Sequence, residues 1–154
     1  MIELPRYKSC FVCGDPARNP QSLGLRSRLD PESGAVTAVF TPKEHHVGYP
    51  DVVHGGILTA LLDEVSIWAA SFRAEAFCVT RELRVKFAQA ARPGEPLQLR
   101  AEVTEYHPRM ITVQASALRA GEGEERVVAR SLGRFYPAFP EEWVEWARRL
   151  GLSP

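Results

Sequence analysis

Apolar residues follow a helical period in the middle of the chain and a period of two in most of the rest. Between His54 and Phe72 they occupy every side of a helical wheel, and no Gly or Pro interrupts the run after Gly55 and Gly56. A helix that is apolar on all sides is typical of a protein interior. The pattern therefore predicts one buried helix around which the remaining chain folds.

Alternating residues predict strands on both sides of this helix. Residues 23–29 and 35–40 are expected to form a hairpin across a turn rich in Asp, Pro and Gly. Longer strands are expected over 78–88, 97–106, 110–119 and 126–136, the last two joined by the Gly-rich residues 120–125. One-sided alternation of this kind is typical of an antiparallel sheet with one face in water.

The strand expected over 78–88 has a particular place in this scheme. Its apolar face would carry Val79, Leu83, Val85 and Phe87. It is also a candidate edge strand, and a long exposed edge is normally covered, most simply by a second copy of the chain. We therefore expect the chain to pair with itself.

The two ends of the chain differ from its middle. Residues 1–22 have no regular period and are expected to form an arm that carries the motif Cys10-x-x-Cys13. Residues 138–154 form a tail in which Pro140 opens a short helix with acidic residues in its first turn and basic residues in its last. For residues 23–137 the predicted fold class is α+β, a curved antiparallel sheet of five to six strands wrapped around one helix.

Composition limits the possible functions. The 154 residues suffice for one core, and nineteen basic residues balance nineteen acidic ones, so neither a nucleic-acid nor a membrane partner is indicated. No apolar run approaches the length of a membrane span, the first residues are too polar for a signal peptide, and three cysteines argue against a disulfide framework. We expect a cytoplasmic protein.

The start of the central helix is a candidate site for negative charge. The first N–H groups of a helix have no partner within it, and Gly55 and Gly56 would let a ligand approach the backbone closely enough to form an oxyanion hole. The alternative is that the two glycines only turn the chain into the helix. His54 would orient these donors, or simply satisfy its own turn, while His45 and His46 would border the site or lie in solvent.

Two adjacent carboxylates in the middle of the helix are the candidate catalytic acids. Asp63 has mostly small neighbours one turn away, so a substrate can reach it, whereas Glu64 has bulkier ones. Burial would raise the pKa of such a carboxyl group towards that of a general base at neutral pH. It could equally act as a nucleophile. The alternative is a buried ionic lock with nearby arginines, for which the candidates are Arg73, Arg81 and Arg84.

The spacing along the helix bears on assembly. Gly55 and Asp63 are eight residues apart, which separates them by about 12 Å along the helix axis. One reacting carbon cannot touch both groups of the same helix. If both act, the glycines and the acid of each site come from different subunits, with two equivalent sites per dimer.

The cysteine pair raises the question of a metal. Zinc requires four ligands, and the sequence offers no second cysteine pair, so His45 and His46 or another subunit would have to complete the site. We therefore expect Cys10 and Cys13 to anchor the arm as small apolar residues, with no metal bound.

These residues together resemble a known family. His54-Gly55-Gly56, with Asp63 nine positions after the histidine, and Thr80-x-x-Leu83-x-Val85-x-Phe87 resemble the hotdog-fold acyl-CoA thioesterases of the PaaI-like group. The arm motif Cys10-x-x-Cys13-Gly14, followed by Asn19-Pro20, and the loop His46-x-Gly48-Tyr49-Pro50 resemble a subgroup of them. The loop departs from members that bind the thioester oxygen with an Asn or Gln, because it reads Val47-Gly48-Tyr49.

The resemblance implies an enzyme that hydrolyses an acyl-CoA or aryl-CoA thioester as a homodimer or homotetramer, with Asp63 as catalytic acid and no cofactor beyond the coenzyme A of the substrate. The residues expected to bind substrate are His46, Trp68, Thr80, Arg84 and Lys86. Arg84, Lys86 and Arg92 could meet the phosphates of coenzyme A, or they could simply lie in solvent on an outer strand face. Ile67, Trp68, Phe72 and Phe77 could line an acyl pocket or belong to the core. The alternatives are a hotdog hydratase or dehydratase and an acyl-CoA binding module without catalysis.

Overall fold

The computed structural model describes residues 1–120 and 126–152. Its elements are β1 (Ile2–Glu3), β2 (Ser27–Leu29), β3 (Val36–Phe40), the 3₁₀ helix η1 (Glu44–His46), β4 (Val47–Tyr49), β5 (Val52–Val53), α1 (Gly55–Ala74), β6 (Phe77–Phe87), β7 (Leu97–His107), β8 (Met110–Arg119), β9 (Val127–Phe139) and α2 (Pro140–Arg149). Residues 121–125 of the expected Gly-rich connection lie outside the described part of the chain.

Helix α1 is the centre of the fold, as the apolar pattern predicts. It contacts β3 and β6 to β9, and Leu61, Leu62 and Val65 are completely buried. Glu75 ends it in a left-handed conformation with φ of 51°. By length and composition alone, α1 could span a membrane, so the expectation that no segment could do so is wrong for this helix. The sheet covers this helix, which identifies it as a core helix.

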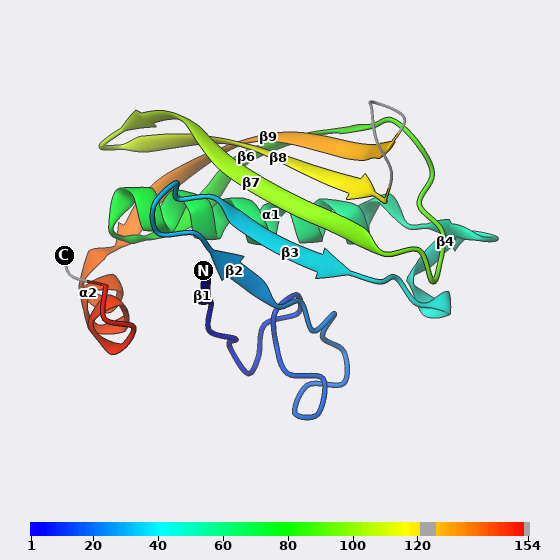
Figure 1. The fold of residues 1–154 in the computed structure, drawn as a ribbon, viewed down its shortest axis with the longest axis horizontal. Coiled ribbons are helices and arrows are strands. Elements are labelled where there is room, and N and C mark those ends of the chain that lie inside the picture. Colours follow the sequence, from blue (N-terminus) through cyan, green and yellow to red (C-terminus); the bar gives the residue numbers. More distant parts are fainter. Residues whose placement is uncertain (121–125, 153–154) are drawn as a thin grey trace.

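The main sheet is antiparallel, with the order β1-β2-β3-β7-β8-β9-β6 among the described residues. In Figure 1, β6, β8 and β9 lie above α1, whereas β1, β2, the rest of the arm and α2 lie below it. The six expected strands are confirmed. The sheet has seven strands among the described residues, one more than the five to six predicted. The additional strand is β1 of the arm, in which Ile2 pairs with Leu29.

Strand β6 lies at the edge of the sheet, as predicted, but the prediction of its apolar face is wrong in part. Leu83 and Val85 are half-buried, whereas Val79 and Phe87 are 43% and 54% exposed. The register of β6 against β9 shifts between Phe77 and Cys78 and again between Thr80 and Glu82. Each shift interrupts the strict alternation that the sequence pattern assumes.

Residues 41–51, which include the loop motif His46-x-Gly48-Tyr49-Pro50, are more ordered than their Pro and Gly residues suggest. They contain η1 and the strand β4, which pairs with β5 just before α1. This small ribbon delivers the chain to the N-terminus of α1 (Figure 1). At the other end of the fold, α2 forms as predicted and packs Trp143 against Phe72 and Phe77 of the core.

Candidate active site

The N-terminus of α1 has one free donor, and it belongs to Gly55. His54 caps the helix, because its Nδ1 accepts the Gly56 N–H at 2.8 Å. The Ile57 N–H donates to the His54 carbonyl at 2.9 Å. Within residues 1–120 and 126–152, nothing accepts the Gly55 N–H. The expected pair of glycine donors is therefore corrected: in this structure the Gly56 amide is engaged by the cap, and Gly55 alone offers its amide to a ligand.

The position of His54 follows from the ribbon before the helix. Its N–H donates to the His46 carbonyl at 2.8 Å. Its ring lies so close to β4 that a Cβ at Gly48 would come within 3.0 Å of its Cδ2 atom. In this structure the His54 ring satisfies its own turn by capping α1, which is the second of the two interpretations of the sequence. A role of His54 in orienting donors for a ligand stays a prediction.

His46 supports this arrangement from inside. It is only 6% exposed, its Nδ1 accepts the Lys43 N–H at 3.0 Å, and its ring stacks on Phe40 with 5.5 Å between centroids. Burial, with the nearby His45 and Lys43 charges, lowers the pKa of the His46 imidazole. His46 therefore lies inside the fold, beside the ribbon that carries His54, and not at the solvent border where it was expected.

Asp63 lies half-buried on α1, and no residue of 1–120 or 126–152 pairs with it as a cation. The Thr80 hydroxyl donates to its Oδ1 at 2.8 Å. Burial raises the pKa of the Asp63 carboxyl group, and the Thr80 hydrogen bond opposes that rise. Thr80 was expected to bind substrate, and in this structure its hydroxyl contacts the candidate acid.

The ionic-lock alternative is wrong for the described residues, because the candidate arginines are engaged elsewhere. The Arg73 guanidinium lies 3.7 Å from the centre of the Tyr106 ring, and that of Arg81 lies 5.4 Å from the Tyr136 ring. Arg84 pairs with Glu82. An acid with raised pKa and no structural ion pair is typical of a functional site.

Glu64 points to a different part of the molecule. Neighbouring residues of a helix project about 100° apart, so Asp63 and Glu64 cannot share one site easily. The Glu64 carboxylate accepts the Trp68 indole N–H at 3.1 Å and the Cys10 thiol at 3.8 Å. The structure therefore does not bring the second candidate acid together with Gly55, Asp63 or Thr80, and it brings Glu64 to the arm instead.

The arm closes over a mainly apolar cavity of about 360 Å³ on this side of α1. Its wall includes three of the four residues proposed for an acyl pocket, Ile67, Trp68 and Phe77. The fourth, Phe72, packs on Trp143 of α2. Cys10, Cys13 and Glu64 also line this cavity, and their ligand atoms lie within 4.8 Å of one another. Burial, followed by the charge of Glu64, raises the pKa of the Cys13 thiol.

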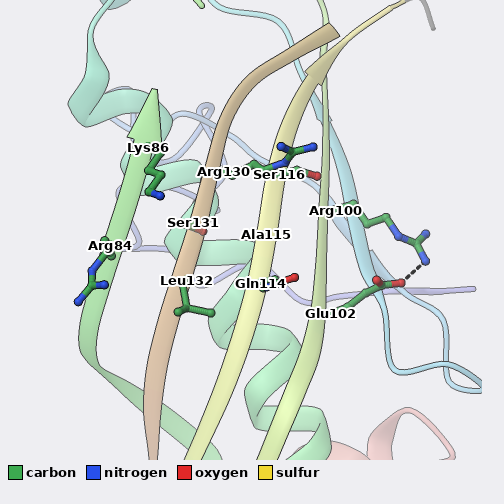
Figure 2. A pocket seen from close by; sticks show the side chains of 10 residues that line it. All are labelled: Arg84, Lys86, Arg100, Glu102, Gln114, Ala115, Ser116, Arg130, Ser131 and Leu132. Carbon is green, nitrogen blue, oxygen red and sulfur yellow. Dashed lines mark hydrogen bonds and ion pairs between the residues drawn. The ribbon is translucent and has the colours of Figure 1, made fainter. Parts of the chain in front are cut away.

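Arg84 and Lys86 lie on the outer face of the sheet. With Arg100 and Arg130 they line a groove of about 380 Å³ across β6 to β9 (Figure 2). These side chains alternate along their strands with residues that pack towards α1, among them Val85, Leu99 and Ala129. In one chain this groove therefore does not adjoin Asp63. Arg92 is not part of its wall, and sequence analysis missed Arg100 and Arg130, which only the strand register brings there.

The sequence and the fold both match known proteins. Residues 51–126, which include all of α1, match the family described as the thioesterase superfamily. No curated protein matches the sequence.

Solved structures show the same fold. A thioesterase superfamily protein from Shewanella loihica is 25% identical to this chain, with a TM-score of 0.61. The match covers 75% of this chain and 91% of that chain. A mutant of the phenylacetic acid degradation protein PaaI from Thermus thermophilus is 23% identical, with a TM-score of 0.67 over 80% of this chain and 100% of that one. A Streptococcus mutans protein bound to acetyl-CoA is 16% identical, with a TM-score of 0.62. The match covers 70% of this chain and 83% of that chain.

Proposed function

Because the chain is a hotdog-fold protein whose residues 51–126 belong to the thioesterase superfamily, we propose that it hydrolyses an acyl-CoA or aryl-CoA thioester with Asp63 as its catalytic acid. One observation carries this proposal. Asp63 is a half-buried carboxylate with a raised pKa and a neutral partner, Thr80, and the described part of the chain supplies no cation that would explain it as an ion pair. Such a group is suited to take a proton or to attack a carbonyl carbon.

The Gly55 amide and the Asp63 carboxylate divide the reaction between them. The Gly55 N–H, supported by the dipole of α1, would bind the thioester oxygen as it becomes negatively charged. Asp63 would either take a proton from the attacking water or attack the carbonyl carbon itself. The carbon–sulfur bond then breaks, and the coenzyme A thiolate leaves and takes up a proton. The general-base route releases the acid at this point, whereas the nucleophilic route leaves an acyl–Asp63 anhydride, which a water molecule must hydrolyse to the free acid and the Asp63 carboxylate. A single turnover in ¹⁸O water tests the nucleophilic route, because label in the Asp63 carboxyl group can arise only when water opens this anhydride at the aspartyl carbon.

The site is proposed to form between two subunits. About 12 Å along α1 separates Gly55 from Asp63 of the same chain, so they cannot act on one carbon. Strand β6 ends the sheet with an unpaired edge among the described strands, and Thr80 and Asp63 lie beside that edge. Pairing two β6 edges around a two-fold axis would bring two copies of α1 together in opposite directions. Gly55 of one copy could then approach Asp63 of the other.

Mixing inactive chains tests the shared site. Heterodimers of Asp63→Asn and Gly55→Pro chains, isolated with two different tags, are expected to regain one intact site of the two. A random mixture should therefore recover about a quarter of the wild-type activity. Mixing each variant with itself is the control. If the isolated heterodimer is as inactive as both parents, the two groups act within one chain and the shared site is rejected.

Removing the Thr80 hydroxyl tests the role of its hydrogen bond. This bond lowers the pKa of Asp63 against the effect of burial, so Thr80→Val should raise the pKa further. Asp63 must be ionised to react, and the acidic limb of the kcat/KM profile should therefore move to higher pH, with less change on the alkaline side. Thr37→Val on β3 is the matched control and should leave the profile in place. An unchanged profile in Thr80→Val would contradict the assignment of that limb to Asp63.

Thiol release from a panel of acyl-CoA and aryl-CoA thioesters tests the activity itself. The panel includes phenylacetyl-CoA and acetyl-CoA because the PaaI protein and the Streptococcus mutans protein resemble this chain. Loss of ultraviolet absorbance with crotonyl-CoA, without thiol release, would identify a hydratase instead. Tight binding without turnover of any member would identify an acyl-CoA binding module.

The basic groove on the outer sheet face supplies a candidate position for the phosphates of coenzyme A. Arg84, Lys86, Arg100 and Arg130 line it (Figure 2), and guanidinium and ammonium groups bind phosphate well. Since the groove does not adjoin Asp63 of its own chain, this role would require a neighbouring subunit to present the groove. That arrangement fits a tetramer made of two dimers.

A further inference from the structure

The arm and helix α1 meet at a cluster that the proposed hydrolysis does not use. We propose that Cys10, Cys13 and Glu64 bind one zinc-class divalent ion, which links residues 1–22 to the middle of α1. The three ligand atoms come from two segments separated by 54 positions in the sequence, and they converge within 4.8 Å. The site is independent of the thioester chemistry proposed for Asp63, and so is its test.

The backbone around the cysteines holds the Cys10 sulfur in place. The N–H groups of Val12 and Cys13 both donate to Cys10 Sγ, at 3.3 and 3.2 Å. These two bonds fix the position of this sulfur beside Cys13 and Glu64. Gly14 closes the turn by donating its N–H to the Cys10 carbonyl at 3.1 Å, and a Cβ at this position would lie only 2.4 Å from that oxygen. A glycine is therefore required for the turn that directs both sulfurs to one side.

The separations suit tetrahedral coordination. Zinc–sulfur bonds of about 2.3 Å and zinc–oxygen bonds of about 2.0–2.2 Å place neighbouring ligand atoms about 3.5–3.8 Å apart. Cys10 Sγ and Glu64 Oε2 are 3.8 Å apart. Little movement is needed to enclose an ion at this point.

The ligand types select the ion. Two thiolates favour zinc over magnesium or calcium, which prefer oxygen ligands. The Glu64 carboxylate is itself oriented, since its other oxygen accepts the Trp68 indole N–H at 3.1 Å. Partners of this kind fix a ligand in place and strengthen metal binding.

Three protein ligands leave one position for a water molecule or another small ligand. Within the described residues no other Cys, His, Asp or Glu joins the cluster. The site opens into the apolar cavity lined by Trp68 and Phe77. The sequence argues against a metal because it offers no second cysteine pair, and no sequence pattern records that Glu64 faces the arm.

Metal titration of the reduced protein tests the proposal. Protein purified without a metal-affinity tag and treated with chelator should bind one equivalent of Zn²⁺ per chain by calorimetry. Co²⁺ should give thiolate-to-cobalt charge-transfer absorption. Zn²⁺ should also protect Cys10 and Cys13 from alkylation, as read by mass spectrometry, and this readout requires no variant. Absence of binding, or binding without protection of these two thiols, would overturn the proposal.

Three ligand variants and one control locate the ion. Cys10→Ser, Cys13→Ser and Glu64→Gln should each weaken Zn²⁺ binding by at least about tenfold. Cys78→Ser is the matched control, because Cys78 lines the same cavity but its thiol is not in the cluster. It should bind as the wild type does. Equal binding by Glu64→Gln and wild type, or equal loss in Cys78→Ser, would refute this ligand set. Circular dichroism of each variant verifies that it is folded.

Discussion

Asp63→Asn is expected to lower kcat for acyl-CoA hydrolysis by a factor of about 10²–10⁴, with a much smaller change in KM. Asn keeps the shape of the side chain and still offers an oxygen to the Thr80 hydroxyl, which donates to Asp63 at 2.8 Å. It cannot take a proton at neutral pH or attack a carbonyl carbon. The loss therefore reports the chemistry of the carboxylate rather than the packing of α1.

Asp63→Asn should lower activity without lowering the free energy of unfolding. The folded-state pKa of Asp63 is raised by burial, so the folded protein binds the proton more tightly than the unfolded chain does. The free energy of unfolding therefore falls as the pH rises from the ordinary pKa of aspartate through the raised one. Asn carries no charge and avoids this loss. We expect Asp63→Asn to unfold at the same temperature as the wild type or higher at neutral pH, with no such decline.

A matched variant separates this result from a general effect of replacing aspartate. Asp30→Asn changes an exposed turn residue between β2 and β3 in the same way. It should retain full activity. If Asp63→Asn hydrolyses the panel at wild-type rates, Asp63 is a structural residue and the proposed mechanism fails.

The parts of the fold that depend on local pattern could be predicted from the sequence. The boundaries of α1 follow from its unbroken apolar run and the glycines before it, and those of α2 from Pro140 and the charges of its first and last turns. Strand β7 alternates between buried and exposed residues over its first half, and neighbours pair with both of its edges. Strand β6 has only one neighbour and two register shifts, so its apolar face could not be obtained from alternation.

The site could be predicted only as far as it lies on one element. The choice of Asp63 and the N-terminus of α1 follows from residues close in sequence. The partner of Asp63 is 17 positions away and that of Glu64 is 54 positions away. Such contacts depend on tertiary packing. The engagement of the Gly56 amide by His54 depends on a side-chain rotamer, which no sequence pattern records.

Gly55→Pro is expected to lower kcat by a factor of about 10²–10³, the usual effect of removing one oxyanion-hole donor. The substitution removes the N–H that has no acceptor in the described structure and leaves the helix intact. Proline is favoured at the first position of a helix. It also restricts the preceding residue to an extended conformation, and His54 already has φ of −61° and ψ of 132°. Circular dichroism and the unfolding temperature should therefore remain close to those of the wild type.

Gly55→Ala is the control that separates the donor from the space around it. Alanine keeps the N–H but adds a Cβ that would lie 3.2 Å from the edge of the Phe87 ring. Phe87 is 54% exposed and can turn aside. We therefore expect a much smaller loss of kcat than in Gly55→Pro. Equal losses in the two variants, both relieved by Phe87→Leu, would mean that the glycine provides room at the start of α1, and the amide would lose its proposed role.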